Sequence, residues 1–116
     1  MALLPIQMQA KLRELVSELV AGNYQQMEAR GFLRPNTAEG TKTTIERYPG
    51  QITLPPPEAF ENIREWVEFA PRADNQRSWM IVFDLWFDHK PTYLVLEATY
   101  TEKANGEQSI VVEGVV

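Results

Sequence analysis

The chain contains no cysteine and only one histidine, His89. Without thiols it has no disulfide framework and no thiolate metal site, and a single histidine argues against a zinc site. The glycine patterns of a nucleophile elbow, a phosphate-binding loop and a dinucleotide-binding turn are also missing. We therefore expect no cofactor and no metal, and the sequence favours a protein that is not an enzyme.

Long apolar runs and clustered cations are absent as well. No run approaches the roughly 18 apolar residues that a membrane-spanning helix needs, and the first residues lack the basic and apolar regions of a signal peptide. Acidic residues outnumber Lys and Arg by 16 to 11, which gives a net charge of −5. Binding to nucleic-acid phosphates needs clustered Lys and Arg. We expect a cytoplasmic protein that binds neither nucleic acid nor membranes.

The sequence does contain enough apolar surface for one domain spanning residues 1–116. It is 44% hydrophobic and 23% charged, which are ordinary values for a globular fold. In the first half, apolar residues recur every three or four positions, and glycines end the segments. Asn23 with Gln26 predicts a capping box at a second helix. Residues 1–50 are therefore predicted to be mainly helical, with helices at residues 5–21, 24–30 and 37–48.

The second half of the chain is predicted to be mainly a β meander. Three prolines form a stiff connector after a short extended piece at residues 51–54, and residues 58–69 fit a helical turn followed by a strand. Alternation and turn signals predict further strands at residues 78–88, 93–101 and 108–116. Helices followed by strands indicate an α+β fold. We expect two or three N-terminal helices packed on one face of a C-terminal antiparallel sheet of three to four strands.

The strand at residues 78–88 is unusual because both of its faces are apolar. Its odd-numbered positions are all apolar, and its even-numbered positions include Met80, Val82 and Trp86. The odd-numbered side chains are expected to face the helices. Antiparallel sheets with helices on one side usually leave the other face polar. The apolar outer face predicted here is therefore the best functional clue in the sequence.

Two assumed turns set the expected register of the sheet. A four-residue turn at residues 89–92 places Asp84 opposite Glu97 and Trp86 opposite Val95. A two-residue Asn105-Gly106 turn, a strong hairpin signal, places Val111 and Val115 on the helix-covered face. The apolar side chains then expected on the outer face are Met80, Val82, Trp86, Tyr93, Val95, Ile110 and Val112.

Asp84 and Glu97 are the candidate chemical groups of this face. Two opposed carboxylates in an apolar surround drive one pKa upward, as general acid–base sites require, and they can also ligate a hard cation. The alternative, which we favour, is that both acids are solvated or paired with Arg or Lys. His89 falls in a predicted turn, where an exposed side chain without a catalytic role is expected.

The hairpin FDLWFDHKPTYLVLEATYTE resembles that of a family of small, uncharacterised bacterial proteins. The matching elements are Asp84-Leu85-Trp86 and the alternating Leu94-Val95-Leu96-Glu97. The early LVAGNYQQM and the segment that runs from Thr37-Ala38-Glu39 to Tyr48 are similar too. The resemblance implies no activity, because the family has none that can be transferred. The order of elements is also similar to the cone-shaped folds of nuclear transport factor 2 and the cystatins, a likeness at the level of fold alone.

Three hypotheses for function follow. The favoured one is a non-enzymatic protein-binding module, for example a bacterial immunity or antitoxin-like protein, whose partner is another protein or a second copy of itself. The binding residues would be Met80, Val82, Asp84, Trp86, Tyr93, Val95 and Glu97. One alternative is a small-ligand-binding protein, or an enzyme with a fold like that of nuclear transport factor 2. It would have a pocket between helices and curved sheet, with Asp84, Glu97 or Tyr100 as its polar groups. The other is a structural homodimer, which the edge of the last strand could form.

Overall fold

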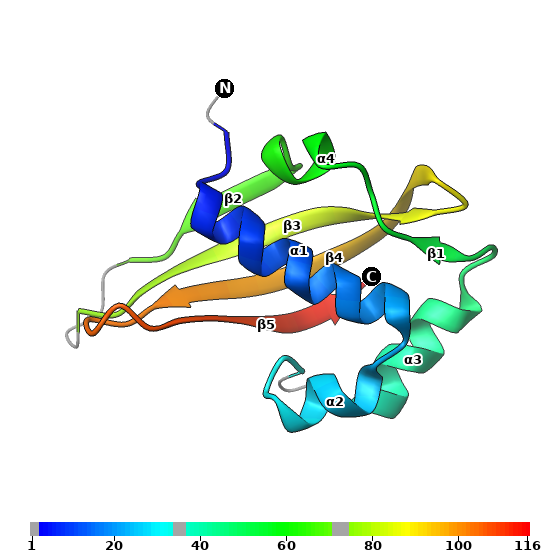
Figure 1. Ribbon diagram of the computed structural model, residues 1–116, viewed down its shortest axis with the longest axis horizontal. Coiled ribbons are helices and arrows are strands. Elements are labelled where there is room, and N and C mark those ends of the chain that lie inside the picture. The colour runs from blue at the N-terminus through cyan, green and yellow to red at the C-terminus, as the bar shows by residue number, and fades with distance from the viewer. Residues whose placement is uncertain (1–2, 34–36, 71–74) are drawn as a thin grey trace.

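A computed structural model describes residues 3–33, 37–70 and 75–116 of the chain. Residues 34–36 of the predicted 33–36 linker and residues 71–74 of the predicted 71–77 loop lie outside these residues. Helices come first and strands follow, as predicted, and the fold is α+β (Figure 1). The elements in chain order are α1 (Ile6–Ala21), α2 (Tyr24–Ala29), α3 (Ala38–Arg47), β1 (Ile52–Thr53), α4 (Glu58–Glu61), β2 (Glu65–Glu68), β3 (Arg77–Phe87), β4 (Lys90–Glu102) and β5 (Gln108–Val115).

The helices form where the apolar spacing and the caps predict them. One stripe of α1 is buried, and Gly22 ends the helix in the left-handed region. At α3 the Thr37 hydroxyl accepts a hydrogen bond of 3.0 Å from the Gly40 N–H, which caps the helix. The predicted capping box of α2 is wrong: Asn23 stands at the cap position, but its side chain makes no capping hydrogen bond. α2 starts after Asn23 because the left-handed conformation of Gly22 ends α1 and changes the direction of the chain.

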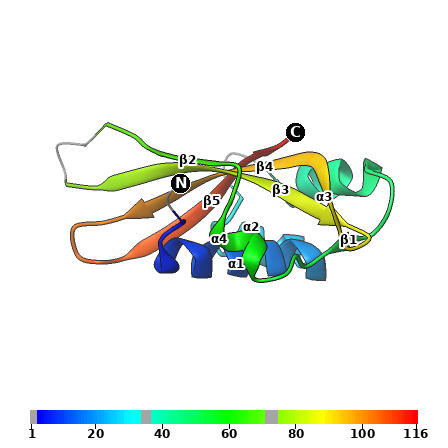
Figure 2. The ribbon, with the colours of Figure 1, turned by 90° about the horizontal axis from the view of Figure 1, so that it is seen from above.

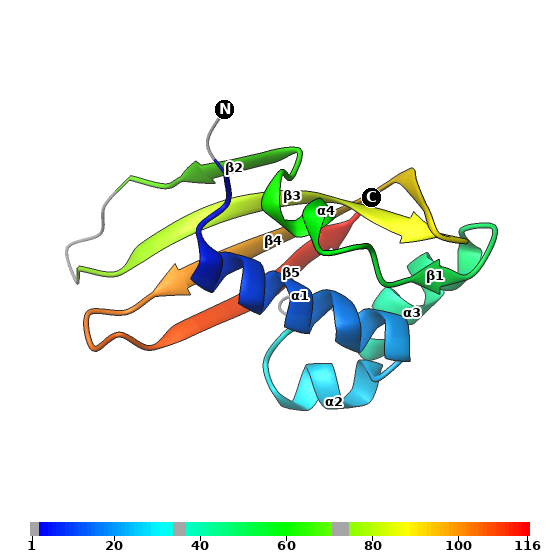
Figure 3. The same cartoon turned by 45° about the horizontal axis from the view of Figure 1, so that its top comes forward.

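The sheet is antiparallel and is built around β3. One edge of β3 pairs with β4, which in turn pairs with β5. The other edge pairs with β2 near the start of β3 and with β1 near its end. Figure 3 shows β1 and β2 on this shared edge, with α4 between them. The pairs with β2 end at Val82 and those with β1 begin at Trp86, so neither strand pairs with residues 83–85 on this edge.

One face of the sheet holds the core. Seen along the sheet in Figure 2, α1, α2 and α4 lie on the same side of it. The odd-numbered side chains of β3 from Trp79 to Phe87 are buried on this side, as predicted. Phe60 of α4 stacks on Phe83 with ring centroids 5.2 Å apart, and Trp79 packs against Tyr100 at 5.8 Å. The helix layer thus covers one face only.

The predicted register between β3 and β4 is wrong by two residues up to Asp84 and by four residues from Trp86 on. Asp84 lies opposite Val95, and Glu97 lies opposite Val82. The connection is a tight turn at Asp88 and His89, both in the left-handed region with φ of 52° and 62°, and not a four-residue turn. Such turns usually contain Asn-Gly or Asp-Gly, so Asp-His was not a visible signal. A shift of two or four residues leaves each paired side chain on the face predicted for it.

A bulge in β4 changes the register of the hairpin between Asp84 and Trp86. Three residues, 92–94, stand opposite the single residue Leu85, because the pairing resumes at Trp86 and Pro91. The Thr92 hydroxyl donates a hydrogen bond of 2.7 Å to the Leu85 carbonyl oxygen. A side chain therefore bonds the backbone carbonyl at the point where the bulge interrupts the regular pairing.

The predicted register of β5 is wrong by one residue from Gln108 to Val112, and this changes the faces there. A shift between Glu97 and Ala98 restores the predicted register, so Val115 lies opposite Leu96 and packs against the core as predicted. The turn has three residues, Ala104 to Gly106: the Lys103 N–H donates to the Glu107 carbonyl oxygen at 2.9 Å, and Gly106 has a φ of 87°. Asn-Gly was read as a two-residue turn, but it occupies the last two positions of the longer kind. Ile110 and Val112 are consequently buried in the core. Val111 is on the outer face instead.

Tyr100 gives the fold a predicted sensitivity to alkaline pH. Burial, and then the hydrogen bond of 3.1 Å that its hydroxyl donates to Glu102, raise the pKa of the phenol above its ordinary value near 10. A raised pKa in the folded state means that stability is full below about pH 10 and declines as the pH rises further. We expect Tyr100→Phe to lower the unfolding free energy by about 1 kcal/mol at pH 7 and to flatten its decline between about pH 10 and 12. Urea titrations at several pH values test this; equal declines in both proteins would contradict it.

Candidate protein-binding face

The outer face is the surface of the sheet that α1 does not cover. Strand pairing arranges its side chains in rows that run across the strands, because residues paired on neighbouring strands point the same way. The central row is apolar apart from one threonine and consists of Val67, Met80, Thr99 and Val111. None of the four is buried, and Val67 is 47% exposed. Four strands thus contribute to one open, largely apolar band.

The next row places acids on both sides of an apolar side chain. It contains Glu65, Val82, Glu97 and Gly114, from β2 to β5. Neither Glu65 nor Glu97 has an ion-pair partner among the residues that the structure describes. Beyond them Val95 lies opposite Asp84, and Trp86 is half-buried near the end of β3. The outer face therefore combines apolar side chains with unpaired carboxylates.

Asp84 and Glu97 do not form the predicted carboxylate pair. The two-residue shift places Glu97 opposite Val82, and Arg64 holds Asp84 instead, with 2.8 Å between Nε and Oδ1. This hydrogen bond and the charge of Asp84 raise the pKa of Arg64. The acid–base and cation-binding readings of the pair are therefore wrong. In the described part of the chain, no three acidic or histidine side chains are close enough to hold a metal.

Tyr93 differs from the other predicted binding residues. It falls within the bulge of β4 and is 90% exposed, so it does not pack on its neighbours. Met80, Val82, Asp84, Trp86, Val95 and Glu97 are partly exposed and belong to the sheet itself. The structure thus brings six of the seven predicted residues together and leaves Tyr93 as a projecting side chain at their edge.

Three contributors to this region were missed in the sequence. Val67 of β2 and Phe69, whose N–H donates to the Ser78 carbonyl oxygen at 2.9 Å, extend the apolar surface past β3. Their alternation with Trp66 and Glu68 was a usable signal once this strand is paired with β3. Val111 was assigned to the wrong face through the turn error.

The polar groups predicted to line a pocket between the helices and the sheet do not lie around a common cavity. Asp84 and Glu97 lie on the outer face, whereas Tyr100 is fully buried among core side chains on the opposite face. Three groups separated by the thickness of the sheet cannot line one cavity.

Comparison with known proteins identifies the family of this chain. A family described as a domain of unknown function (DUF7668) matches residues 16–116. The chain belongs to this family. The match in this DUF7668 chain includes every strand, so the whole outer face lies within it. The expectation of an uncharacterised family is confirmed. Searches of curated proteins and of solved structures returned no match.

The helices of this DUF7668 chain are short or polar for a membrane span. Among those described, none has a stretch both long and apolar enough to span a membrane. The longest, α1, has 16 residues and presents polar side chains on one side.

Proposed function

We propose that this DUF7668 chain is a non-enzymatic docking module that binds a basic protein through the outer face of its sheet. The observation that carries the proposal is the open band of Val67, Met80 and Val111 beside two carboxylates, Glu65 and Glu97, that have no ion-pair partner in the described structure. Apolar patches rimmed by polar groups mark interaction sites more often than plain solvent-facing surface.

The side-chain types support a protein partner. Met and Trp are enriched in protein interfaces, where partly exposed anchors become buried on binding. Met80 and Trp86 have this exposure and lie on a rigid strand paired on both sides. A preformed surface of this kind loses little conformational entropy when a partner docks.

The charges support a basic partner over a second copy of the chain. Two outer faces packed together would bring Glu65 and Glu97 of one copy toward the same acids of the other, and like charges in an interface disfavour binding. A basic surface would pair with these acids, and the net charge of −5 would speed its approach. A bacterial immunity protein that neutralises a basic toxin in the cytoplasm is one protein with this chemistry.

Two variants that each add one positive charge test the proposal. Val82→Arg places a cation between Glu65 and Glu97, where the fold tolerates it because both acids can pair with it. Ala10→Arg adds the same charge on the exposed side of α1. We expect the wild-type chain and Ala10→Arg to capture the same basic protein from an extract of the source cells. Calorimetry with that protein should show one-to-one binding that weakens with salt and at least a ten-fold loss for Val82→Arg.

Several results would overturn this function. A captured protein that is acidic, or one that Val82→Arg retains with unchanged affinity, would place the interface elsewhere. Failure of the wild-type chain to capture a basic protein would remove the partner class altogether. A doubled mass in light scattering that Val82→Arg halves would identify the second copy as the occupant.

A further inference from the structure

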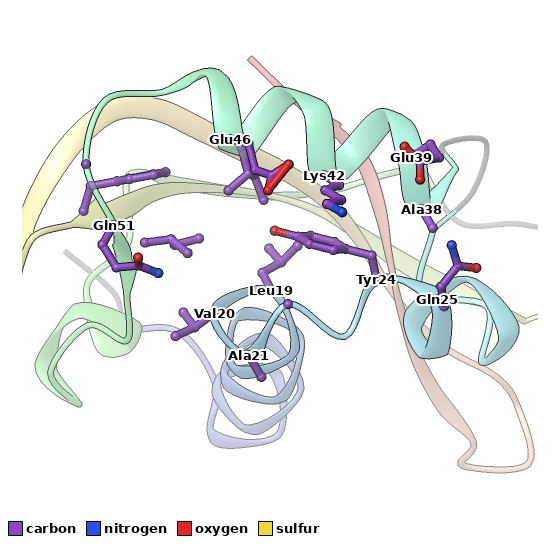
Figure 4. A pocket seen from close by; sticks show the side chains of 15 residues that line it. Leu19, Val20, Ala21, Tyr24, Gln25, Ala38, Glu39, Lys42, Glu46 and Gln51 are labelled. Carbon is purple, nitrogen blue, oxygen red and sulfur yellow. The ribbon is translucent and has the colours of Figure 1, made fainter.

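A cleft of about 610 Å³ opens on the side of the molecule where the first three helices meet β1. It lies away from the outer face, between the end of α1, the start of α2, the inner side of α3 and the segment at Gln51 and Ile52 (Figure 4). Its volume is in the range of clefts that bind small molecules. The local sequence explains it: Gly22 turns the chain out of α1, and α3 returns past the gap.

The floor of the cleft is apolar and fixed. Leu19, Ile45, Ile52 and Phe87 line it, and all four are buried members of the main core. Tyr48 packs on Phe87 with ring centroids 4.6 Å apart, which holds this wall in place. These side chains are almost wholly buried, so they fix the shape of the cleft, while Val20 and Ala21 of α1 present more exposed apolar atoms to it.

The mouth of the cleft carries polar groups without protein partners. Figure 4 shows Tyr24 pointing into the cleft, with its hydroxyl on the side of Glu46 and Lys42 close to its ring. Within the described chain, no hydrogen bond or ion pair engages the side chains of Tyr24, Lys42, Glu46, Gln25 or Gln51. Burial, and secondarily Glu46, raise the pKa of Tyr24, so its phenol stays protonated and available. Polar groups from several elements thus converge over an apolar floor.

The charge balance of the cleft is negative. Glu39 and Glu46 line it against the single cation Lys42. The carbonyl end of α1 also borders it, and the last turn of α1 has no basic residue to offset the partial negative charge there. The amino end of α3 contributes a partial positive charge of similar size, so the two helix ends offset each other and the net charge of −1 from Glu39, Glu46 and Lys42 remains.

We infer that this cleft binds a small organic cation, a primary amine with an apolar or aromatic body. The body would rest on Val20 and Ala21 at the end of α1, beside the ring of Tyr24, and the ammonium group would face the Glu46 carboxylate and the oxygen of Tyr24. The ring of Tyr24 adds an aromatic face that attracts cations. This binding site is separate from the outer face, so it stands or falls independently of the docking function.

Three matched probes test the inference on the full chain. 2-Phenylethylamine, 2-phenylethanol and phenylacetate share one ring and differ in charge, and amide NMR titration measures each affinity. We expect the amine to bind with a dissociation constant of about 1–10 mM, as suits a small fragment, and the anion to bind at least about ten-fold more weakly. The shifts should concentrate on Gly22, Gln25 and Gln51.

Variants of the charged side chains test whether Glu46 binds the ammonium group. Glu46→Gln should weaken amine binding about five-fold, the size of one charge pair near water, and should leave 2-phenylethanol unchanged. Lys42→Met should tighten amine binding, and Glu113→Gln, an exposed acid on β5, should have no effect. Equal affinity for the three probes, equal effects of Glu46→Gln and Glu113→Gln, or shifts that map to the outer face would each overturn the inference.

Discussion

Replacing Ile110 with alanine is expected to lower the free energy of unfolding by about 2–5 kcal/mol, the range for large aliphatic side chains deleted from cores. Ile110 is 1% exposed and pairs with Tyr100, whose side chain is fully buried. The neighbouring change Val111→Ala should cost less than about 1 kcal/mol, because Val111 is only partly buried on the outer face. The contrast between adjacent residues follows directly from the three-residue turn.

Denaturant unfolding of both variants measures this contrast. Val112→Ala is the matched control, since it removes the same atoms as Val111→Ala from a fully buried position. It should cost about 1–3 kcal/mol more than Val111→Ala. If Val111→Ala lowers the unfolding free energy more than Val112→Ala does, the three-residue turn is wrong and the two-residue turn with its register is correct.

Replacing Gly50 with alanine is expected to lower the unfolding free energy by about 2–4 kcal/mol. The φ of Gly50 is 101°, which other residues rarely adopt. Holding an alanine in this left-handed conformation costs about 1–2 kcal/mol. An added Cβ would also overlap the Asp88 carboxylate, approaching its Cγ to 3.1 Å. Asp88 would have to move, and its Oδ1 would lose the 3.0 Å hydrogen bond from the Gln51 N–H, worth about 1 kcal/mol.

Gly106 supplies the control for this prediction. Its φ of 87° is also left-handed, but nothing lies within 4 Å of an added Cβ. Gly106→Ala should therefore cost about 1 kcal/mol, from the backbone alone. Combining Gly50→Ala with Asp88→Ala should cost less than the sum of the single changes, because the overlap disappears. Additive effects, or equal costs for the two glycines, would show that Asp88 does not constrain Gly50.

Most of the architecture could be predicted because it depends on periodicity. The apolar spacing of α1 identifies its buried stripe, and the alternation in β3 identifies the side chains from Trp79 to Phe87 as core. The face of a β3 or β4 side chain survives an error of two residues, since side chains alternate with a period of two. The outer-face positions of Met80, Val82 and Trp86 were therefore predictable.

Opposing pairs could not be predicted, since they depend on turns that the sequence specifies weakly. Asp88 and His89 both adopt the left-handed region without a glycine, and the bulge at residues 92–94 needs Thr92 to complete its hydrogen bonds. Asn105-Gly106 fits two turn lengths that differ by one residue, and the longer one was adopted. The outer face consequently lost Ile110 and Val112 and gained Val111.

The polar part of both sites depended on long-range pairing. Glu65 and Glu97 come to flank Val82 only because β2 and β4 pair with opposite edges of β3. Likewise, Tyr24 and Glu46 are distant in sequence and meet because α3 returns past the end of α1. No local spacing encodes either arrangement.

The methionine methyl groups offer the most direct test of the docking face. Met80 lies on the outer face, whereas Met8 and Met27 are buried on the helix side. In methyl NMR spectra of the chain titrated with its captured basic partner, the Met80 signal should shift and broaden while those of Met8 and Met27 stay in place. If Met8 or Met27 responds and Met80 does not, the partner binds the helices and the outer face is not the docking surface.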